Sequence, residues 1–490
     1  MYHKDIGSCE MYRHKTNARV QIPEGEKFMN ERNVRPFSKR DEIGYVFGDM
    51  AGSFVNLFVD AYFLTFCTYV LGISPAWMGS LFLAARLWDA VNDPIMGSFP
   101  DRWMLGKSGD KFKPWIKIFM IPLALSGVLC FSKVPFEGVA LHAWVAFVYV
   151  LYGMSYTGTS MPFGAMASVV STDPIDRSKL SRARSLGGTF VGIAALSFVP
   201  VVCFDSESNI IPERFTLLAV IFGILSVVCY CLLLHLTTER VREERKQNTE
   251  KFNYGNVLKA VVKNRPLIGV MVATIGSMLY ITGSNQIRSY VFKEYYGNTS
   301  AMTLLSLASV PIIIICFPLV PKLVAKFGKK TTLMFGVISS TVLSVIIFAV
   351  KIPNVYVYSV LNVLAMIGQT VFTMLIWAFV TDCIDYHEYQ TGERSDGSLY
   401  SIYTFSRKIG STLASTIASF SLGAIGYISG IEAQTAAVAG HIRSLCTFIP
   451  VATCVLELLG IGLVYNLTNQ KTTEMYAVLK KRREEEQAQE

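Results

Sequence analysis

The sequence RLWDAVNDP at residues 86–94 places charged side chains inside an apolar run, 76–100, that is long enough to cross a bilayer. Asp89 and Asp93 are one helical turn apart and therefore share a face, with Arg86 one turn before them. A charge at bilayer depth costs roughly 2.5–3.5 kcal/mol, so it faces a cavity, an ion or a partner. The helix then either lines a transport pathway or uses an Arg86–carboxylate pair to lock two helices together. Because there are two acids and only one base, we favour the transport pathway over the structural pair.

The composition is that of a membrane protein with many spans. Of 490 residues, 52% are hydrophobic and 17% are charged, and the mean hydropathy is +0.40. Twelve apolar runs are long enough to cross about 30 Å of hydrocarbon. We therefore predict an all-α membrane protein with twelve transmembrane helices at approximately 44–72, 76–100, 114–132, 141–166, 183–204, 214–236, 266–292, 301–320, 331–351, 354–381, 398–426 and 442–466.

The loops indicate an internal repeat. Asp101 and Arg102 follow the second run, and KFGKK at 326–330 follows the eighth, six runs later. A charged linker lies between them, so the chain divides into two six-helix halves, as in major facilitator transporters. We expect a hydrophilic N-terminal tail at 1–40, a first half at 41–236, the linker at 237–265, a second half at 266–468 and a C-terminal tail at 469–490.

The distribution of Lys and Arg predicts the orientation. The connections after spans two, four, six and eight are basic, whereas loops 72–76 and 427–440 contain neither residue. Basic loops stay in the cytoplasm, so we expect both termini there. The net charge of +9 follows from this topology and does not indicate nucleic-acid binding.

The chain shows no sign of enzymatic chemistry. Residues 106–108 read GKS, but Asp101 stands where a phosphate-binding loop needs glycine. The ten cysteines form no CxxC pair and read as small apolar residues. We expect a transporter that is not an enzyme and needs no cofactor or resident metal. Its expected partners are a small-molecule substrate and the lipid bilayer, and we expect it to function as a monomer.

Polar stripes also mark three other spans. The first carries Asp49, Ser53, Asn56 and Asp60 on one face, either toward solute or as a helix–helix seam built on the small residues at 48–52. The fourth offers rings and hydroxyls of the kind that bind sugars, unless these are only packed aromatics: Tyr149, Tyr152, Tyr156, Thr157 and Ser160.

The eleventh span carries a lysine, Lys408, on a face that also contains hydroxyl groups. A buried lysine needs a counter-charge, and Asp89 and Asp93 are the candidates. Alternatively, Lys408 and Arg407 extend to the membrane interface. Arg288, in the seventh span, either contacts substrate or marks the outer interface.

Several blocks of sequence resemble the glycoside-pentoside-hexuronide:cation symporters. They are RLWDAVNDPIMG at 86–97, GDKFKPW at 109–115, NRPL at 264–267, WAFVTDCIDYHEYQTGERSDGSLYS at 377–401 and TFSRKIGS at 404–411. Within this family, GKK at 328–330, RKIG at 407–410 and HIRSL at 441–445 look closest to the bacterial glucuronide carrier. The resemblance implies a major facilitator fold, a bacterial inner membrane and sugar uptake coupled to a cation.

The resemblance also implies roles for individual residues. The cation-coupling set is Asp89, Asn92, Asp93, Thr157 and Lys408. Thr404 matches a sugar-site position and Arg184 matches the arginine of span five. With the polar stripes, the predicted substrate-binding set is Asp49, Ser53, Asn56, Tyr156, Ser160, Arg184, Arg288, Trp377, Tyr400, Thr404 and Lys408.

Departures from the family bear on the substrate. Ser53 and Ser160 stand where melibiose-type carriers have aspartates, and Gly164 stands where they have tryptophan. An anionic sugar, a glucuronide or hexuronide, is therefore favoured over a neutral galactoside. One H⁺ makes transport of such an anion electroneutral, which favours H⁺ over Na⁺, although Na⁺ could bind at Asp89 and Asp93. The alternatives are symport of a neutral glycoside or pentoside with Na⁺, and a lipid-type transporter.

Overall fold

The computed structural model describes residues 35–103, 105, 109–171, 173–240, 264–392 and 396–489. Residues 1–34 of the predicted tail and 241–263 of the predicted linker lie outside the described residues. The helices all belong to one compact unit, Phe37–Glu490. Within the described residues the only extended pairing is a bridge between Phe204 and Ile210.

The first half of the chain forms the helices α1 (Lys39–Tyr69), α2 (Pro75–Arg102), α3 (Lys113–Cys130), α4 (Gly138–Val170), α5 (Pro174–Phe190), η1 (Val191–Ala195), α6 (Leu196–Cys203) and α7 (Pro212–Leu236). The second half forms α9 (Arg265–Tyr290), η2 (Val291–Tyr295), α10 (Ala301–Phe327), α11 (Lys329–Ala349), α12 (Val355–Thr391), α13 (Asp396–Ala424), α14 (Ala436–Leu458) and η3 (Leu459–Val464), followed by α15 (Asn469–Gln489). The segments α5–η1–α6, α9–η2 and α14–η3 are each continuous and form one span.

All twelve predicted spans are helical. Ten are long and apolar enough to cross a membrane by length and composition. The other two, α2 and α13, are less apolar because each carries charged residues, and they have 28 and 29 residues, which suffices at about 1.5 Å per residue. Several helices extend beyond the apolar run that predicted them: the fifth span begins at Pro174, and α12 continues to Thr391. Hydropathy marks the apolar part of a helix, and the polar turns at its ends lie outside that part.

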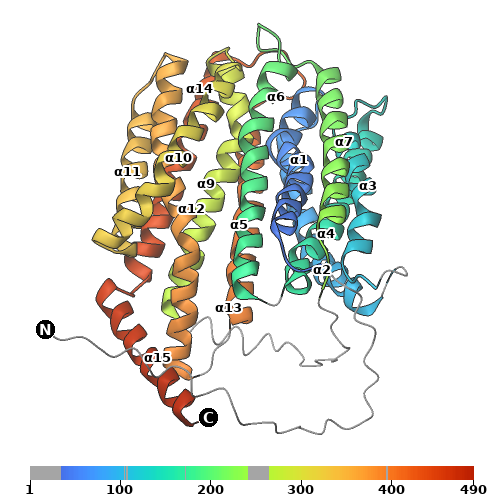
Figure 1. Cartoon of the computed structure of the whole chain (residues 1–490). Coiled ribbons are helices and arrows are strands. Elements are labelled where there is room, and N and C mark those ends of the chain that lie inside the picture. Colours follow the sequence, from blue (N-terminus) through green and yellow to red (C-terminus); the bar gives the residue numbers. More distant parts are fainter. Residues whose placement is uncertain are drawn as a thin grey trace, which may run out of the picture. The chain divides into compact units, whose positions relative to one another are not determined.

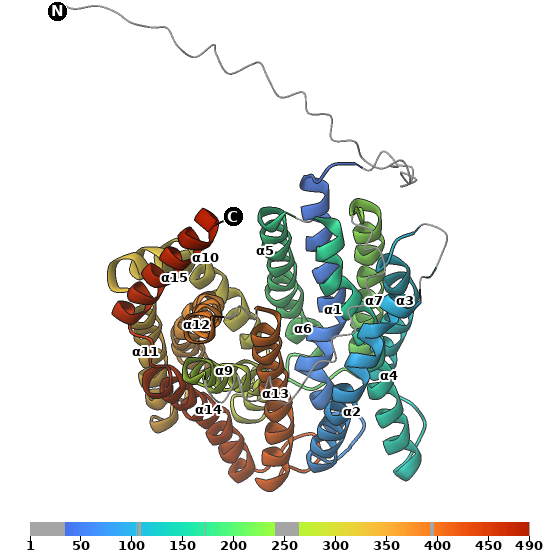
Figure 2. The same cartoon turned by 90° about the horizontal axis from the view of Figure 1, so that it is seen from below.

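Helices α1–α7 and α9–α14 form two groups, coloured blue to green and yellow to red in Figures 1 and 2. In the first half α1 packs against α5 and α7, and α3 packs against α4 and α7; in the second, α9 packs against α13 and α14, and α11 against α12 and α14. The halves meet where α2 lies beside α13, α1 beside α9 and α6 beside α10. The predicted two-half, all-α architecture is confirmed.

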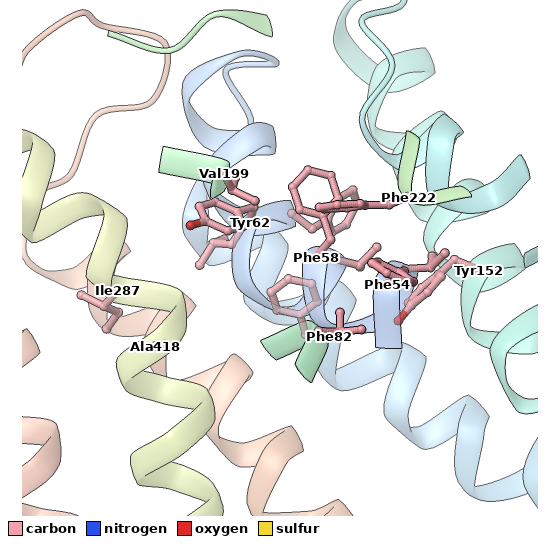
Figure 3. Packing of buried hydrophobic residues seen from close by; sticks show 14 of the residues in the cluster. Phe54, Phe58, Tyr62, Phe82, Tyr152, Val199, Phe222, Ile287 and Ala418 are labelled. Carbon is pink, nitrogen blue, oxygen red and sulfur yellow. The ribbon is translucent and has the colours of Figure 1, made fainter. Parts of the chain in front are cut away.

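An aromatic core orients α1. The Phe58 ring lies 4.2 Å from that of Phe131 and 5.2 Å from that of Phe222, centroid to centroid, and Figure 3 shows Phe54, Phe58 and Phe222 gathered on one side of α1. Phe58 points away from the stripe that begins at Asp49, because the two lie on opposite sides of the helix. Burial of the rings therefore turns the stripe toward α2, α4 and α5.

The two ends of the bundle differ. At one, here called the basic end, lie Lys179, Arg240 and Lys329. At the opposite, far end, hydrogen bonds join the halves: Thr65 Oγ1 lies 2.7 Å from Ser289 Oγ, and the Tyr69 hydroxyl donates to Glu294 at 2.8 Å. The far end is thus closed by direct contacts between α1 and the α9–η2 helix.

Candidate functional site

The charged face of α2 forms the centre of the candidate site. Asp93 Oδ1 accepts a hydrogen bond from Thr157 Oγ1 of α4 at 3.0 Å, and Asp93 Oδ2 forms an ion pair with Lys408 Nζ of α13. Asp89 Oδ2 pairs within its own helix with Arg86 Nη1 at 3.2 Å. Asp93 therefore contacts both halves of the protein, whereas the ion pair of Asp89 stays inside α2.

Beside these carboxylates lie further polar groups that can serve a cation. Asn92 is buried, and its Nδ2 has no hydrogen-bond partner among the described residues. The carboxylates, the Asn92 amide and the Thr157 hydroxyl offer oxygen ligands to Na⁺, and a carboxylate in a partly desolvated site can instead take up a proton. No three His, Cys, Asp or Glu side chains converge as a metal site in the described part of the chain.

The lower part of the α1 stripe contacts α5. Asp49 Oδ1 accepts a hydrogen bond from Arg184 Nε at 3.0 Å. A Cβ at Gly188 would lie 2.6 Å from Asp49 Oδ2, and one at Gly187 would lie 2.3 Å from the Val46 carbonyl oxygen, so only glycines allow this approach. The Arg184 side chain is paired and still 46% exposed, which leaves it accessible to an anion.

The upper part of the stripe contacts α4. Asn56 Nδ2 donates to Asp60 Oδ2 at 3.0 Å, and the Tyr152 hydroxyl donates to Asn56 Oδ1 at 2.7 Å. The Tyr156 ring stacks beside that of Tyr152, with centroids 6.2 Å apart. Polar side chains along this face thus meet polar partners on neighbouring helices, so the stripe is more than a seam of small residues.

Both predicted serines are partly buried: Ser53 lies on this stripe and Ser160 on α4. A Cβ at Gly188 would lie 3.5 Å from Ser53 Oγ, which places Ser53 beside α5. Neither serine adds a carboxylate to this face. The acids of the site region are Asp49, Asp60, Asp89 and Asp93, all from the first half.

The second half contributes cations and an aromatic pair. The Trp377 ring of α12 meets that of Tyr403 of α13 edge-on, with centroids 4.9 Å apart. The Arg407 guanidinium lies 5.8 Å from the Trp377 ring centroid. Trp377 is 41% exposed and Lys408 has half of its side chain exposed. A sugar ring can stack on such an exposed indole.

Two other predicted site residues, Tyr400 and Thr404, belong to α13. Thr404 is partly buried one turn before Lys408, and the side chain of Tyr400 lies outside the described residues. The packing of α13 on α9 includes a hydrogen bond from Gln286 Nε2 to Ser415 Oγ at 2.9 Å.

Arg288 is not brought to this site. It lines a separate cavity inside the second half with Tyr280, Ser284 and Tyr358. On the same helix, Ser289 faces α1 through its contact with Thr65, so Arg288, the next residue, points in a different direction. This separates Arg288 from the residues with which the sequence grouped it.

Two residues of the site region were not among the predicted site residues. Asp60 was expected only as one member of the α1 stripe, and Arg407 only in the alternative in which it extends to the interface. Asn56 and Asp60 are one helical turn apart, and this spacing predicts contact between the amide and the carboxylate. The pairing of Arg407 with Trp377 joins residues thirty positions apart, and only the fold brings them together.

Comparisons with known proteins identify the family of the chain. Residues 44–469 match the family model described as MFS/sugar transport protein. The chain is 31% identical to the uncharacterized symporter YjmB of Bacillus subtilis, over 91% of this chain and 96% of that protein. It is 28% identical to the glucuronide carrier protein homolog of Escherichia coli, over 92% of this chain and 97% of that protein.

A solved structure shares the architecture. The crystal structure of a D-xylose-proton symporter superposes with a TM-score of 0.60 at 14% identity, covering 89% of this chain and 99% of the other. At this level of identity the likeness concerns the fold alone, and the fold is the one that the sequence predicted.

Proposed function

Because the chain belongs to the MFS/sugar transport protein family, that of the glycoside-pentoside-hexuronide:cation symporters, we propose that it imports a glucuronide or other hexuronide together with H⁺ by alternating access. Family membership makes the chain a membrane transporter with many spans and not an enzyme. Our proposal concerns the identity of the sugar, the coupling ion and the roles of individual residues.

The ion pair between Asp93 and Lys408 carries this proposal. It joins the two halves at the charged face of α2, and Asp93 is 13% exposed while Lys408 is 50% exposed. A sugar carboxylate that binds Lys408 competes with Asp93 for the same ammonium group. Asp93, once released, can take up a proton, so that sugar and H⁺ each favour the binding of the other.

The charge of the site supports an anionic sugar. Arg184, Arg407 and Lys408 are all exposed to some degree, whereas Ser53 and Ser160 add no negative charge. Arg184 offers a planar guanidinium suited to a carboxylate, although Asp49 already pairs with the same guanidinium. The similarity to a glucuronide carrier protein homolog points the same way.

H⁺ is the proposed coupling ion, because one proton with one monoanion moves no net charge. Asn92 and Thr157 could instead complete an oxygen shell for Na⁺ with Asp89 and Asp93. Na⁺ would therefore bind at the same site, and transport assays distinguish coupling to Na⁺ from coupling to H⁺. A lipid substrate fits less well, because the residues that line the site are polar.

The orientation is also proposed. Placing the basic end in the cytoplasm of a bacterium puts the closed far end outside, so the described state would accept solute from the cytoplasmic side. Import then requires the far-end contacts of Thr65 and Tyr69 to separate while the halves close at the other end. We propose that a single chain suffices for this cycle.

Counterflow uptake tests the proposal. Vesicles loaded with unlabelled sugar are assayed with labelled glucuronides, matched glucosides and pentosides, in Na⁺ buffer and in Na⁺-free buffer. The expected result is exchange of the glucuronide without Na⁺ and weak exchange of its neutral analogue. Exchange of neutral sugars only, or exchange that requires Na⁺, would support the alternative symporter, and lysophospholipid binding without sugar exchange would support a lipid transporter.

A further inference from the structure

The cavity inside the second half is lined by a cation that has no counter-charge. Helices α9, α10, α12 and α14 contribute to its wall, and Arg288 comes from α9. The α9–η2 span ends at Tyr295, so Arg288 lies seven residues, or about 10 Å, inside it. The Arg288 side chain is partly buried. Within the described residues its guanidinium has neither a hydrogen bond nor an ion pair.

Acidic side chains of the same helices are already paired or too distant. Glu294, on the same span as Arg288, forms an ion pair with Lys293 at 3.0 Å. Glu457 of α14 lies beside Gly276, where an added Cβ would be 3.2 Å from Glu457 Cγ. Gly276 is twelve residues, or about 18 Å, from Arg288 along α9. The acids of α12 lie toward the basic end, so the described part of the chain supplies no carboxylate to Arg288.

Hydrogen-bond donors line the same cavity. Tyr280, Ser284 and Arg288 follow one another at steps of four residues and share one face of α9. Ser284 Oγ is buried and has no hydrogen-bond partner among the described residues. From α12, Asn362 Nδ2 donates to the Tyr358 carbonyl oxygen at 2.8 Å, which leaves the second N–H of that amide available. The cavity thus combines a positive charge with hydroxyl and amide donors, the groups that bind an anion.

The size of the cavity limits which anion can enter. Its free volume is about 20 Å³, enough for about one solute of the size of a water molecule. A sugar does not fit into this volume. Apolar side chains complete the wall and cannot replace the water around a strongly hydrated anion such as phosphate: Phe292, Leu305, Met366 and Pro450. The cavity therefore suits a monovalent, monatomic anion.

We propose that this cavity binds one chloride ion, held by the Arg288 guanidinium and the Ser284 hydroxyl, with Tyr280 and Asn362 as further donors. The site goes beyond the proposed function, because it involves neither the sugar nor the coupling cation. Bound chloride neutralises a charge that would otherwise lie uncompensated inside the span. Chloride then stabilises the folded protein to an extent that depends on its concentration.

Thermal unfolding of the protein purified in detergent tests the site. At constant ionic strength, methanesulfonate, which is too large for the cavity, is replaced by chloride at about ten times its dissociation constant. The melting temperature should then rise by about 3 °C. Arg288→Gln should melt at the same temperature in both salts. Lys351→Gln, which removes an exposed cation from the same half, should keep the wild-type response.

A second variant keeps the test decisive if Arg288→Gln does not fold. Ser284→Ala removes a hydroxyl that has no partner among the described residues, so the melting temperature without chloride should not fall. The chloride concentration that gives half of the effect should rise about fivefold, as expected for one lost hydrogen bond. A side chain that serves only packing would leave that concentration unchanged, and this result in Ser284→Ala would count against the site.

Three other results would overturn the chloride site. The first is a wild-type melting temperature that is equal in the two salts. The second is an undiminished chloride effect in Arg288→Gln, which would place the ion elsewhere. The third is stabilisation by a glucuronide in place of chloride that is lost in Arg288→Gln, since this would assign the cavity to the sugar carboxylate.

Discussion

Replacement of Asp93 by asparagine separates coupling from binding. Asparagine can still accept the hydrogen bond of Thr157 Oγ1, but it can neither hold a proton nor neutralise Lys408. The exchange of a charge-assisted for a neutral hydrogen bond costs about 1 kcal/mol, which a folded membrane domain tolerates. We therefore expect the Asp93→Asn protein to fold and to be inserted.

The expected effect on accumulation is large. A proton falling through one pH unit releases about 1.4 kcal/mol, enough to accumulate an electroneutral substrate about tenfold. Wild-type vesicles with a gradient of one unit should approach that ratio, and Asp93→Asn vesicles should stay near one. In this variant the side chain at 93 no longer competes with the sugar carboxylate for Lys408, so anion affinity should stay the same or rise up to about fivefold, the equivalent of about 1 kcal/mol for a half-exposed pair.

Two assays on the same vesicles give the answer. Uptake of labelled glucuronide under an imposed pH gradient measures accumulation, and counterflow measures binding and translocation without a gradient. Glu213→Gln, with its exposed side chain, controls for handling and expression. Accumulation at the wild-type ratio in Asp93→Asn would refute the assignment of Asp93 to coupling.

Three further outcomes are expected. A glucuronide should compete better than its matched glucoside by about 1–3 kcal/mol, or roughly 5- to 140-fold, because one charge-assisted bond is lost with the carboxylate; equal competition would show that sugar charge is not recognised. Addition of substrate in Na⁺-free buffer should make the medium more alkaline, and Asp89→Asn should abolish this signal, whereas strict Na⁺ dependence without a pH change would assign the site to Na⁺. Gly188→Ala should lower the free energy of unfolding by about 1–3 kcal/mol and impair transport, because the added Cβ would lie 2.6 Å from Asp49 Oδ2. Gly440→Ala, which has no neighbour within 4 Å, should leave both unchanged.

Much of the fold could be predicted from the sequence because the bilayer imposes it. Apolar length predicts spans, and the predicted helices are all present, including α2 and α13 despite their charges. Helical periodicity alone is enough to place Asp89 and Asp93 on one face of their helix. What hydropathy cannot supply is the polar ends of helices, such as the continuation of α12 to Thr391.

The site was less predictable, because its contacts join distant parts of the chain. The need of Lys408 for a counter-charge was readable, but the sequence could not decide between Asp89 and Asp93. The direction in which the Arg288 side chain points, into the second half, depends on how α9 packs. The role of the glycines at 187 and 188 follows only from the packing of α1 against them, since glycine in a membrane helix has several other uses.

The origin of the charges has a consequence for how such a protein can diversify. The acids described around the candidate site come from the first half, whereas Trp377, Arg407 and Lys408 come from the second. Changes in α12 and α13 can therefore alter which sugar is accepted while the ion chemistry of α2 is inherited unchanged. Chimaeras that exchange only the second half between related carriers would be expected to alter sugar preference and leave ion preference with the recipient.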